Sequence, residues 1–109
     1  MKSIIQDKKE CYVCGRTTNL HNHHVIFGKN RKNADKDGLT VYLCYDHHEG
    51  QEGVHSKNGH ALDLELKQVA ERKWLTHYHK YVEDFIERYG KNYLWELAEN
   101  NMKCLLITQ

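Results

Sequence analysis

The chain has no proline, no internal repeat and no low-complexity tract, so its 109 residues are expected to form one domain (1–109) without a long linker. Its apolar runs fall far short of the roughly 18 residues that a membrane span needs. The opening segment, MKSIIQDKKE, is too polar for a signal peptide. We therefore expect a cytoplasmic protein without membrane contacts, in a compartment where a CxxC pair serves as a metal site more often than as a disulfide.

A strong charge of one sign is also missing, since the formal net charge is only +1. This excludes a uniformly basic coat for nucleic acids but is compatible with a local basic patch. The apolar fraction of 39% is low for a globular protein. A small domain with so modest a core gains from a staple such as a structural metal.

Histidine, by contrast, is abundant. Nine histidines are present, and six of them lie between residues 21 and 55, with three of the four cysteines among or just before them. Imidazole is the commonest metal ligand in proteins. The clustering of histidine with cysteine therefore favours metal binding.

The cysteine spacing predicts a structural zinc site. Cys11 and Cys14 form a C-x2-C step, and Cys44 and His47 form a C-x2-H step. Two such steps supply the four corners of a tetrahedral Cys3His site for structural Zn²⁺. Two alternatives stay open: Cys104 could replace His47 as the fourth ligand, or the cysteines could be ordinary thiols. Without a ligand role, Cys104 is expected to be a small apolar residue of the C-terminal tail.

The pattern of apolar residues predicts strands followed by helices, an α+β arrangement. Strands are expected over residues 20–27 and 39–44, with a loop over 28–38 between them and a short helix after residue 44. Apolar residues at steps of three and four from Leu62 to Tyr89 predict one long amphipathic helix or two consecutive ones, ending near Gly90. A shorter helix is expected over 91–101, and the polar residues 1–10 are expected to be mobile. The core or a dimer interface is expected to hold the aromatic residues of the helical region, Trp74, Tyr78, Tyr81, Phe85 and Tyr89.

Four histidines near the zinc ligands remain without a role: His23, His24, His48 and His55. If His47 faces the zinc, its neighbour His48 points elsewhere. His23 and His24 are separated in the same way, because successive strand residues point to opposite faces. The doubled histidines therefore indicate a second site. His21 is expected to face solvent or to orient a ligand, and the surface is expected to carry His60, His77 and His79.

The C-x2-C knuckle, HHV on a strand, LTVYLC and DHH, in this order and at these spacings, resemble the HNH endonucleases. The resemblance covers residues 11–55. It implies a ββα-metal (His-Me finger) core with a zinc knuckle, followed by a C-terminal helical extension over 61–102, and a metal-dependent nuclease that hydrolyses DNA phosphodiester bonds. Small zinc-containing members are often encoded by phages or prophages, which implies the cytoplasm of a bacterial host and phage packaging or recombination proteins as partners.

By position, the resemblance makes His23 and His48 ligands of a catalytic divalent cation and His24 the general base that activates water. His55 would be a third ligand or a contact to the scissile phosphate. An all-imidazole set favours Zn²⁺, Ni²⁺ or Mn²⁺, with Mg²⁺ a weaker candidate. Zinc-bearing members usually have C-x2-C followed directly by histidine, whereas this chain has His47 in the place of the last cysteine, which preserves the zinc chemistry.

The asparagine in the middle of the family's motif has no counterpart in this chain. Its place at the start of the second strand is taken by Leu39 or Gly38. Asn30 and Asn33 in the preceding loop are the candidates to brace that loop instead. This departure affects the expected loop geometry more than the expected chemistry.

The predicted loop 28–38 carries Lys29, Arg31 and Lys32, which are expected to contact DNA phosphates. Arg31 is the strongest candidate, because a guanidinium binds a phosphate through two hydrogen bonds. A homodimer would suit cleavage of both strands, although nothing in the sequence demands one. The alternative function is a zinc-stabilised module that binds nucleic acid or protein without cleavage, and such a module has no use for the second set of histidines.

Overall fold

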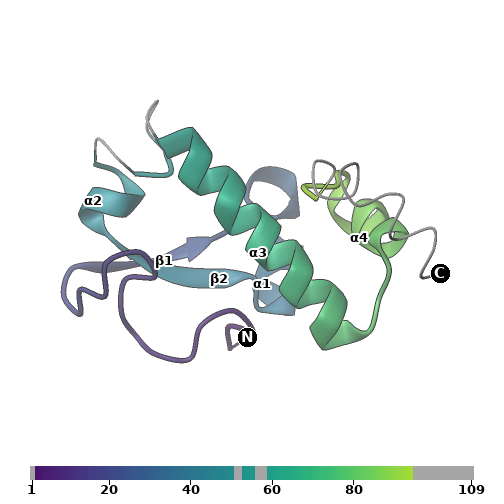
Figure 1. Ribbon diagram of the computed structural model, residues 1–109, viewed down its shortest axis with the longest axis horizontal. Coiled ribbons are helices and arrows are strands. Elements are labelled where there is room, and N and C mark those ends of the chain that lie inside the picture. The colour runs from purple at the N-terminus through teal and green to yellow at the C-terminus, as the bar shows by residue number, and fades with distance from the viewer. Residues whose placement is uncertain (1, 51–52, 56–58, 95–109) are drawn as a thin grey trace.

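The computed structural model of the chain describes residues 2–50, 53–55 and 59–94. It is a small mixed α/β structure in which a long helix crosses the middle of the molecule, with a two-stranded sheet on one side and a short helix at the far end (Figure 1). The elements in chain order are strand β1 (Leu20–His24), the 3-10 helix η1 (Gly28–Asn30), α1 (Arg31–Asp37), β2 (Thr40–Cys44), α2 (Tyr45–His48), α3 (His60–Tyr78) and α4 (Val82–Tyr89). None of the helices within these ranges is long and apolar enough to cross a bilayer.

The sheet sets which histidines can meet. β1 and β2 pair antiparallel, in a register that places Leu20 opposite Cys44 and His24 opposite Thr40. Because side chains alternate along a strand, His21 and His23 share one face of β1 and His24 lies on the other. The two strands are shorter than predicted, since residues 25–27 and residue 39 lie outside them.

The prediction of a loop over residues 28–38 is wrong, because most of this segment is helical. η1 and α1 fill it, and α1 ends at Gly38, whose φ of +78° is the left-handed conformation that glycine adopts without strain. Within α1 only Ala34 and Asp37 are buried. One small residue and one acid, three positions apart, leave no apolar stripe for a sequence reading to detect.

The long helical region divides into two helices, one of the two predicted arrangements. α3 ends where His79 takes a left-handed φ of +55°, and α4 begins with a capping box between Tyr81 and Asp84. α4 ends at Gly90 as predicted, with a φ of +80°. Residues 91–94 are not helical, and the rest of the predicted helix over 91–101 lies outside the described residues, as does the C-terminal tail with Cys104.

One contiguous apolar cluster joins the sheet to the helices. It includes Val41 and Leu43 of β2 with Leu66, Trp74 and Phe85 of the helical region. Three of the five predicted aromatic residues lie in this core: Trp74, Phe85 and Tyr89. Tyr78 is half-buried and packs against the core, whereas Tyr81 is 76% exposed.

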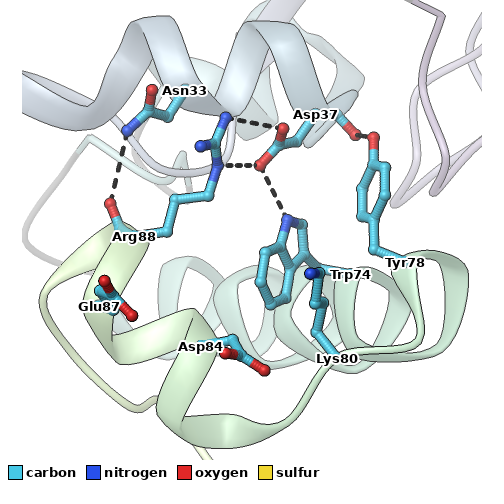
Figure 2. A pocket seen from close by; sticks show the side chains of 8 residues that line it. All are labelled: Asn33, Asp37, Trp74, Tyr78, Lys80, Asp84, Glu87 and Arg88. Atoms are coloured by element: carbon cyan, nitrogen blue, oxygen red, sulfur yellow. Dashed lines mark hydrogen bonds and ion pairs between the residues drawn. The ribbon is translucent and has the colours of Figure 1, made fainter.

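Asp37 links α1 to both helices of the helical region (Figure 2). Its carboxylate accepts hydrogen bonds from Trp74 Nε1 at 2.8 Å, from Arg88 Nε and Nη2 at 2.5 and 2.9 Å, and from the Tyr89 hydroxyl at 2.5 Å. The Tyr78 hydroxyl donates to the Asp37 carbonyl at 2.9 Å. Burial and the adjacent carboxylate raise the pKa of Tyr89, so its hydroxyl stays protonated and can donate.

A second buried acid, Glu71, lies in α3. Its side chain is fully buried, and Oε1 accepts a hydrogen bond from the Tyr93 backbone N–H at 2.7 Å. Oε2 has no hydrogen-bond partner among the described residues. Burial therefore raises the pKa of the Glu71 carboxyl from 4.5 to about 7.

The N-terminal arm, residues 2–10, was expected to be mobile but is bound to the region of β2. Ser3 Oγ donates to the Thr40 carbonyl at 2.5 Å, and the Ile4 N–H donates to the Gly38 carbonyl at 2.9 Å. The Tyr42 N–H donates to Gln6 Oε1 at 2.8 Å. The arm thus satisfies backbone groups that β2 would otherwise leave unpaired.

Candidate metal centres

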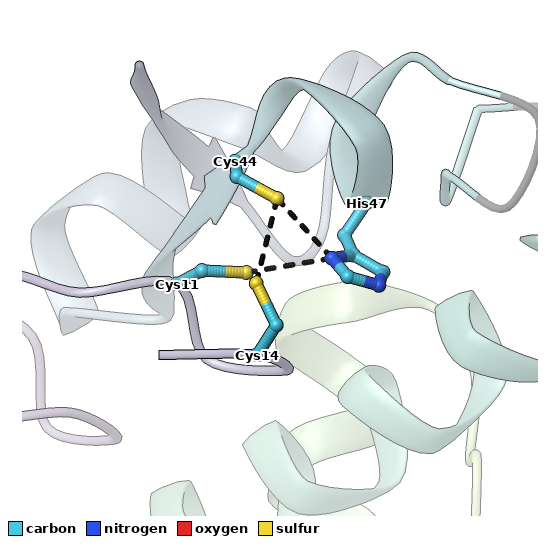
Figure 3. A group of neighbouring side chains, drawn as sticks. All are labelled: Cys11, Cys14, Cys44 and His47. Atoms are coloured by element: carbon cyan, nitrogen blue, oxygen red, sulfur yellow. Dashed lines mark hydrogen bonds between the residues drawn. The ribbon is translucent and has the colours of Figure 1, made fainter. Parts of the chain in front are cut away.

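The four predicted zinc ligands lie together (Figure 3). Cys11 and Cys14 come from the knuckle before β1, Cys44 ends β2, and His47 lies in α2; one ligand atom of each lies within 4.8 Å of all the others. The Sγ atoms of Cys14 and Cys44 are 3.7 Å apart, and His47 Nδ1 lies 3.7 Å from Cys11 Sγ and 3.2 Å from Cys44 Sγ.

These spacings match a tetrahedral zinc site. Bond lengths of about 2.3 Å for Zn–S and about 2.0–2.1 Å for Zn–N place two sulfurs about 3.8 Å apart and a sulfur and nitrogen about 3.6 Å apart. The quartet is therefore close enough to bind a metal such as zinc. The alternative fourth ligand, Cys104, lies outside the described residues.

Backbone hydrogen bonds hold the knuckle in place. The Cys11 N–H donates to the Arg16 carbonyl at 2.7 Å, and the Gly15 N–H donates to the Cys11 carbonyl at 2.9 Å, with Gly15 at a φ of +79°. The Tyr12 N–H donates to the Tyr42 carbonyl of β2 at 2.8 Å. Burial raises the pKa of the Cys11 thiol, but hydrogen bonds from surrounding backbone N–H groups outweigh it and lower the pKa to about 6. The thiolate, which is the form that binds metals, is thus favoured at neutral pH.

A second group consists of His23 of β1, His48 of α2 and His55, whose ligand nitrogens lie within 4.8 Å of one another. The Nε2 atoms of His48 and His55 are 3.2 Å apart. The His23 ring lies 5.1 Å from the His48 ring and 5.4 Å from the His55 ring, measured between centroids. We call these three residues the three-histidine cluster.

The electrostatics of the three-histidine cluster favour the neutral form of His23 and of His48. His23 is only 2% exposed, and its Nε2 is buried without a hydrogen-bond partner in the described part of the chain. Burial lowers the His23 pKa to about 3, with further lowering from His48 and His55, and burial also lowers the pKa of His48. A buried polar atom without a partner is costly, and a missing ligand is one explanation for it. Three imidazoles with ligand nitrogens this close together are a donor set that fits a cation.

Local backbone structure brings His55 to this cluster. The Val54 N–H donates to the His47 carbonyl at 3.0 Å and the His55 N–H to the His48 carbonyl at 3.3 Å, so residues 53–55 fold back along α2. A Cβ atom at Gly53 would lie only 2.6 Å from the His48 carbonyl carbon. Glycine at this position therefore permits the close return of the chain.

The predicted general base, His24, is not part of the three-histidine cluster. Its Nε2 lies 3.1 Å from Asp35 Oδ1, and its Nδ1 accepts a hydrogen bond from Arg31 Nε at 3.4 Å. Both partners come from α1. Asp35 was not identified from the sequence, because the helix that presents it was not predicted.

A cavity of about 720 Å³ lies beside His24. The predicted phosphate contacts all line it: Lys29 from η1, and Arg31 and Lys32 from α1, together with Lys36. The structure thus gathers these cations around His24, from a helix rather than from the expected loop. An excess of cations around an open cavity suits an anionic ligand.

The remaining residues named from the sequence lie outside both histidine and cysteine groups. Asn30 Nδ2 donates to the Tyr89 carbonyl at 3.1 Å and Asn33 Nδ2 to the Arg88 carbonyl at 3.5 Å, so both brace η1 and α1 against the end of α4. Leu39, at the place of the family's asparagine, is fully buried. The predicted surface histidines are exposed: His60, His77 and His79.

His21 contacts the three-histidine cluster from outside. Its Nδ1 lies 2.8 Å from Nδ1 of His48. The sequence left open whether this residue faces solvent or orients a ligand. The strand alternation that separates His23 from His24 also places His21 on the face of His23, and this signal was present in the sequence.

Comparisons with known proteins add no further constraint on the site. No family model matches the chain, no curated protein matches it in sequence, and no solved structure matches it.

Proposed function

We propose that the chain is a metal-dependent endonuclease of the HNH type, with residues 11–55 as its ββα-metal core. The observation that carries this proposal is the three-histidine cluster, whose ligand nitrogens lie within 4.8 Å of one another and in which Nε2 of His23 is buried without a hydrogen-bond partner among the described residues. A cavity lined by four cations and Asp35, with His24 on its wall, would supply the second half of the site. A module that only uses zinc as a staple needs neither feature.

The cationic cavity is suited to a phosphodiester backbone. Lys29, Arg31 and Lys32 can neutralise phosphates, which gives affinity for DNA without sequence readout. Arg31 Nε donates a long hydrogen bond of 3.4 Å to Nδ1 of His24. Exchange of this contact for a phosphate oxygen would place the scissile group beside the imidazole.

His24 is proposed to take the proton of the attacking water. In this proposal Asp35 Oδ1 accepts a hydrogen bond from the Nε2–H of His24. The ring proton of His24 then stays on Nε2, and the lone pair is left on Nδ1. A neutral imidazole in this tautomer can act as a general base near neutral pH. Asp35 thereby fixes the orientation of the ring.

The two candidate metal centres have different proposed roles. The Cys3His quartet would hold a structural Zn²⁺ that pins the knuckle to α2. The three-histidine cluster would hold a catalytic Zn²⁺, Ni²⁺ or Mn²⁺, with Mg²⁺ weaker. When bound there, a divalent cation would stabilise the negative charge that develops on the phosphate and on the leaving oxygen.

Cleavage of supercoiled plasmid tests the proposal. Purified protein is incubated with plasmid and Mg²⁺, Mn²⁺, Ni²⁺ or Zn²⁺ in turn, with wild type beside His24→Ala and the exposed control His77→Ala. Wild type and His77→Ala are expected to nick or cut, whereas His24→Ala is expected to lose about 10²–10⁴-fold in rate, the usual contribution of a general base. Zinc content and circular dichroism are expected to be unchanged in His24→Ala.

Retained nicking by His24→Ala would rule out His24 as the base. Absence of cleavage by wild type with every metal, together with retained DNA binding, would favour the zinc-stabilised binding module instead. Gel-shift titration of the same plasmid measures DNA binding.

A further inference from the structure

The two ring nitrogens of His48 face different neighbours. Nε2 lies 3.2 Å from Nε2 of His55, within the three-histidine cluster, and Nδ1 lies 2.8 Å from Nδ1 of His21, outside it. The His21 ring is nearly perpendicular to the His48 ring, at 88°, with centroids 4.9 Å apart. His48 is therefore held from two sides, and only one side belongs to the proposed cation site.

We propose that His21 is a positioning residue that fixes His48 as a metal ligand. His21 Nδ1 accepts the Nδ1–H of His48, which leaves the lone pair of His48 on Nε2, directed at the three-histidine cluster. A neutral imidazole has one N–H and one lone pair, so the partner of one nitrogen decides the role of the other. This inference rests on the cation site of the proposed function but not on DNA cleavage.

A second metal between His21 and His48 is the competing explanation, because these two residues and Glu49 also bring ligand atoms within 4.8 Å. The proton count argues against it. If Nε2 of His48 binds a cation, Nδ1 carries the ring proton, and a second cation there would require an imidazolate. Donation of that proton to His21 requires no such ionisation.

The distances point the same way. With Zn–N bonds of about 2.0–2.1 Å, two nitrogens 3.2 Å apart subtend about 100° at the metal, close to a tetrahedral angle. Nitrogens 2.8 Å apart would subtend only about 85°. A separation of 2.8 Å is instead typical of an N–H hydrogen bond.

The matched pair His21→Asn and His21→Leu tests this role. An asparagine Oδ1 occupies nearly the position of a histidine Nδ1 and can accept the same hydrogen bond, whereas leucine has a similar shape and no acceptor. The exposed His60 provides the matched controls His60→Asn and His60→Leu. Each protein is first loaded with one equivalent of Zn²⁺ and is then titrated with Co²⁺. The ligand-field absorption of Co²⁺ reports its binding. Absence of a thiolate-to-cobalt charge-transfer band verifies that Co²⁺ has not entered the Cys3His quartet.

His21→Leu is expected to weaken Co²⁺ affinity about 10–100-fold, the usual cost of losing a partner behind a metal-bound histidine. His21→Asn is expected to stay within a few-fold of wild type, as are both His60 variants. In the wild-type protein loaded with two equivalents of Zn²⁺, long-range ¹⁵N–¹H correlations are expected to show the His48 ring proton on Nδ1. The rescue by His21→Asn separates a positioning role from a general loss of stability, because asparagine restores the hydrogen-bond acceptor without restoring the imidazole ring.

The outcomes distinguish the two proposals. If wild type takes up no Co²⁺ beyond the zinc, the three-histidine site fails, and the proposed function fails with it. If wild type binds Co²⁺ and His21→Leu binds it equally well, only the role of His21 is overturned. If the His48 proton is on Nε2, the role of His21 is overturned together with that of His48 Nε2 as a ligand, because a protonated nitrogen cannot bind the cation. If wild type binds a third equivalent of metal that both His21 variants fail to bind, a second metal between His21 and His48 would be established instead.

Discussion

Removal of the Asp37 carboxylate is expected to destabilise the fold more than any other single change to an acidic side chain of α1. Asp37→Ala deprives three donors of their acceptor: the Trp74 indole, the Arg88 guanidinium and the Tyr89 hydroxyl. Hydrogen bonds to a charged group contribute about 1.5–3 kcal/mol each. They are not additive here, because they share one carboxylate and because 34% of the Arg88 side chain is exposed and can be rehydrated.

We therefore expect a loss of about 3–5 kcal/mol, the range found when one partner of a buried ion pair is removed. A domain of this size has a total unfolding free energy of about 5–15 kcal/mol, so the loss is a large share of it. With an m-value of about 1.5 kcal/mol/M, the urea midpoint is expected to fall by about 2–3 M.

Urea denaturation of the zinc-loaded protein, followed by tryptophan fluorescence, measures this shift. The matched control is Asp35→Asn, on the same helix, where 55% of the carboxylate side chain is exposed and little change in the urea midpoint is expected. Equal midpoints for Asp37→Ala and wild type would refute the view that Asp37 ties α1 to α3 and α4. A loss of similar size in Asp35→Asn would show that charge removal from α1, rather than the Asp37 contacts, is responsible.

Two further predictions concern the Cys3His quartet and the buried acid of α3, Glu71. Cys44→Ser is expected to lose its zinc and its cooperative thermal transition, because a structural zinc supplies folding free energy directly. The control Cys104→Ser is expected to keep its zinc and its thermal transition. Elemental analysis measures the zinc content and circular dichroism the transition, and a folded Cys44→Ser protein with full zinc content would contradict the Cys3His assignment. For Glu71, the pKa raised from 4.5 to about 7 means that the stabilisation from its protonated form is present at low pH and is lost as the pH rises through that window. Glu71→Gln keeps an acceptor for the Tyr93 N–H and cannot ionise, so it is expected to exceed wild type in unfolding free energy by up to about 3 kcal/mol at about pH 8 and to match it near pH 4.5. Urea midpoints of both proteins across this range test it, and a parallel pH dependence would show that Glu71 does not titrate as expected.

The Cys3His quartet could be predicted from the sequence because its spacing is local. A C-x2-C or C-x2-H step brings two ligands together within one turn, so only the pairing of the two steps had to be inferred. The structure places Cys11, Cys14, Cys44 and His47 together as that inference requires. The convergence of His23 and His48 followed from the same logic, since each is the immediate neighbour of a residue that faces elsewhere.

Helix α1 could not be predicted in the same way. It buries Ala34 and Asp37, and its stability depends on partners in α3 and α4 that lie 37 to 52 residues further along the chain. A charged residue that is buried by distant donors looks like a solvated loop residue in the sequence. The missed helix also concealed Asp35 as the partner of His24.

His47 and His48 are consecutive, so the two candidate ion centres are joined by a single peptide bond. A rotation of α2 that improves the geometry at one centre must move the ligand of the other. Binding at the two centres is then thermodynamically coupled, and the coupling is reciprocal: an ion that tightens one centre changes the affinity of its neighbour by the same factor. An ion bound by the Cys3His quartet would then also regulate cation uptake at the three-histidine cluster.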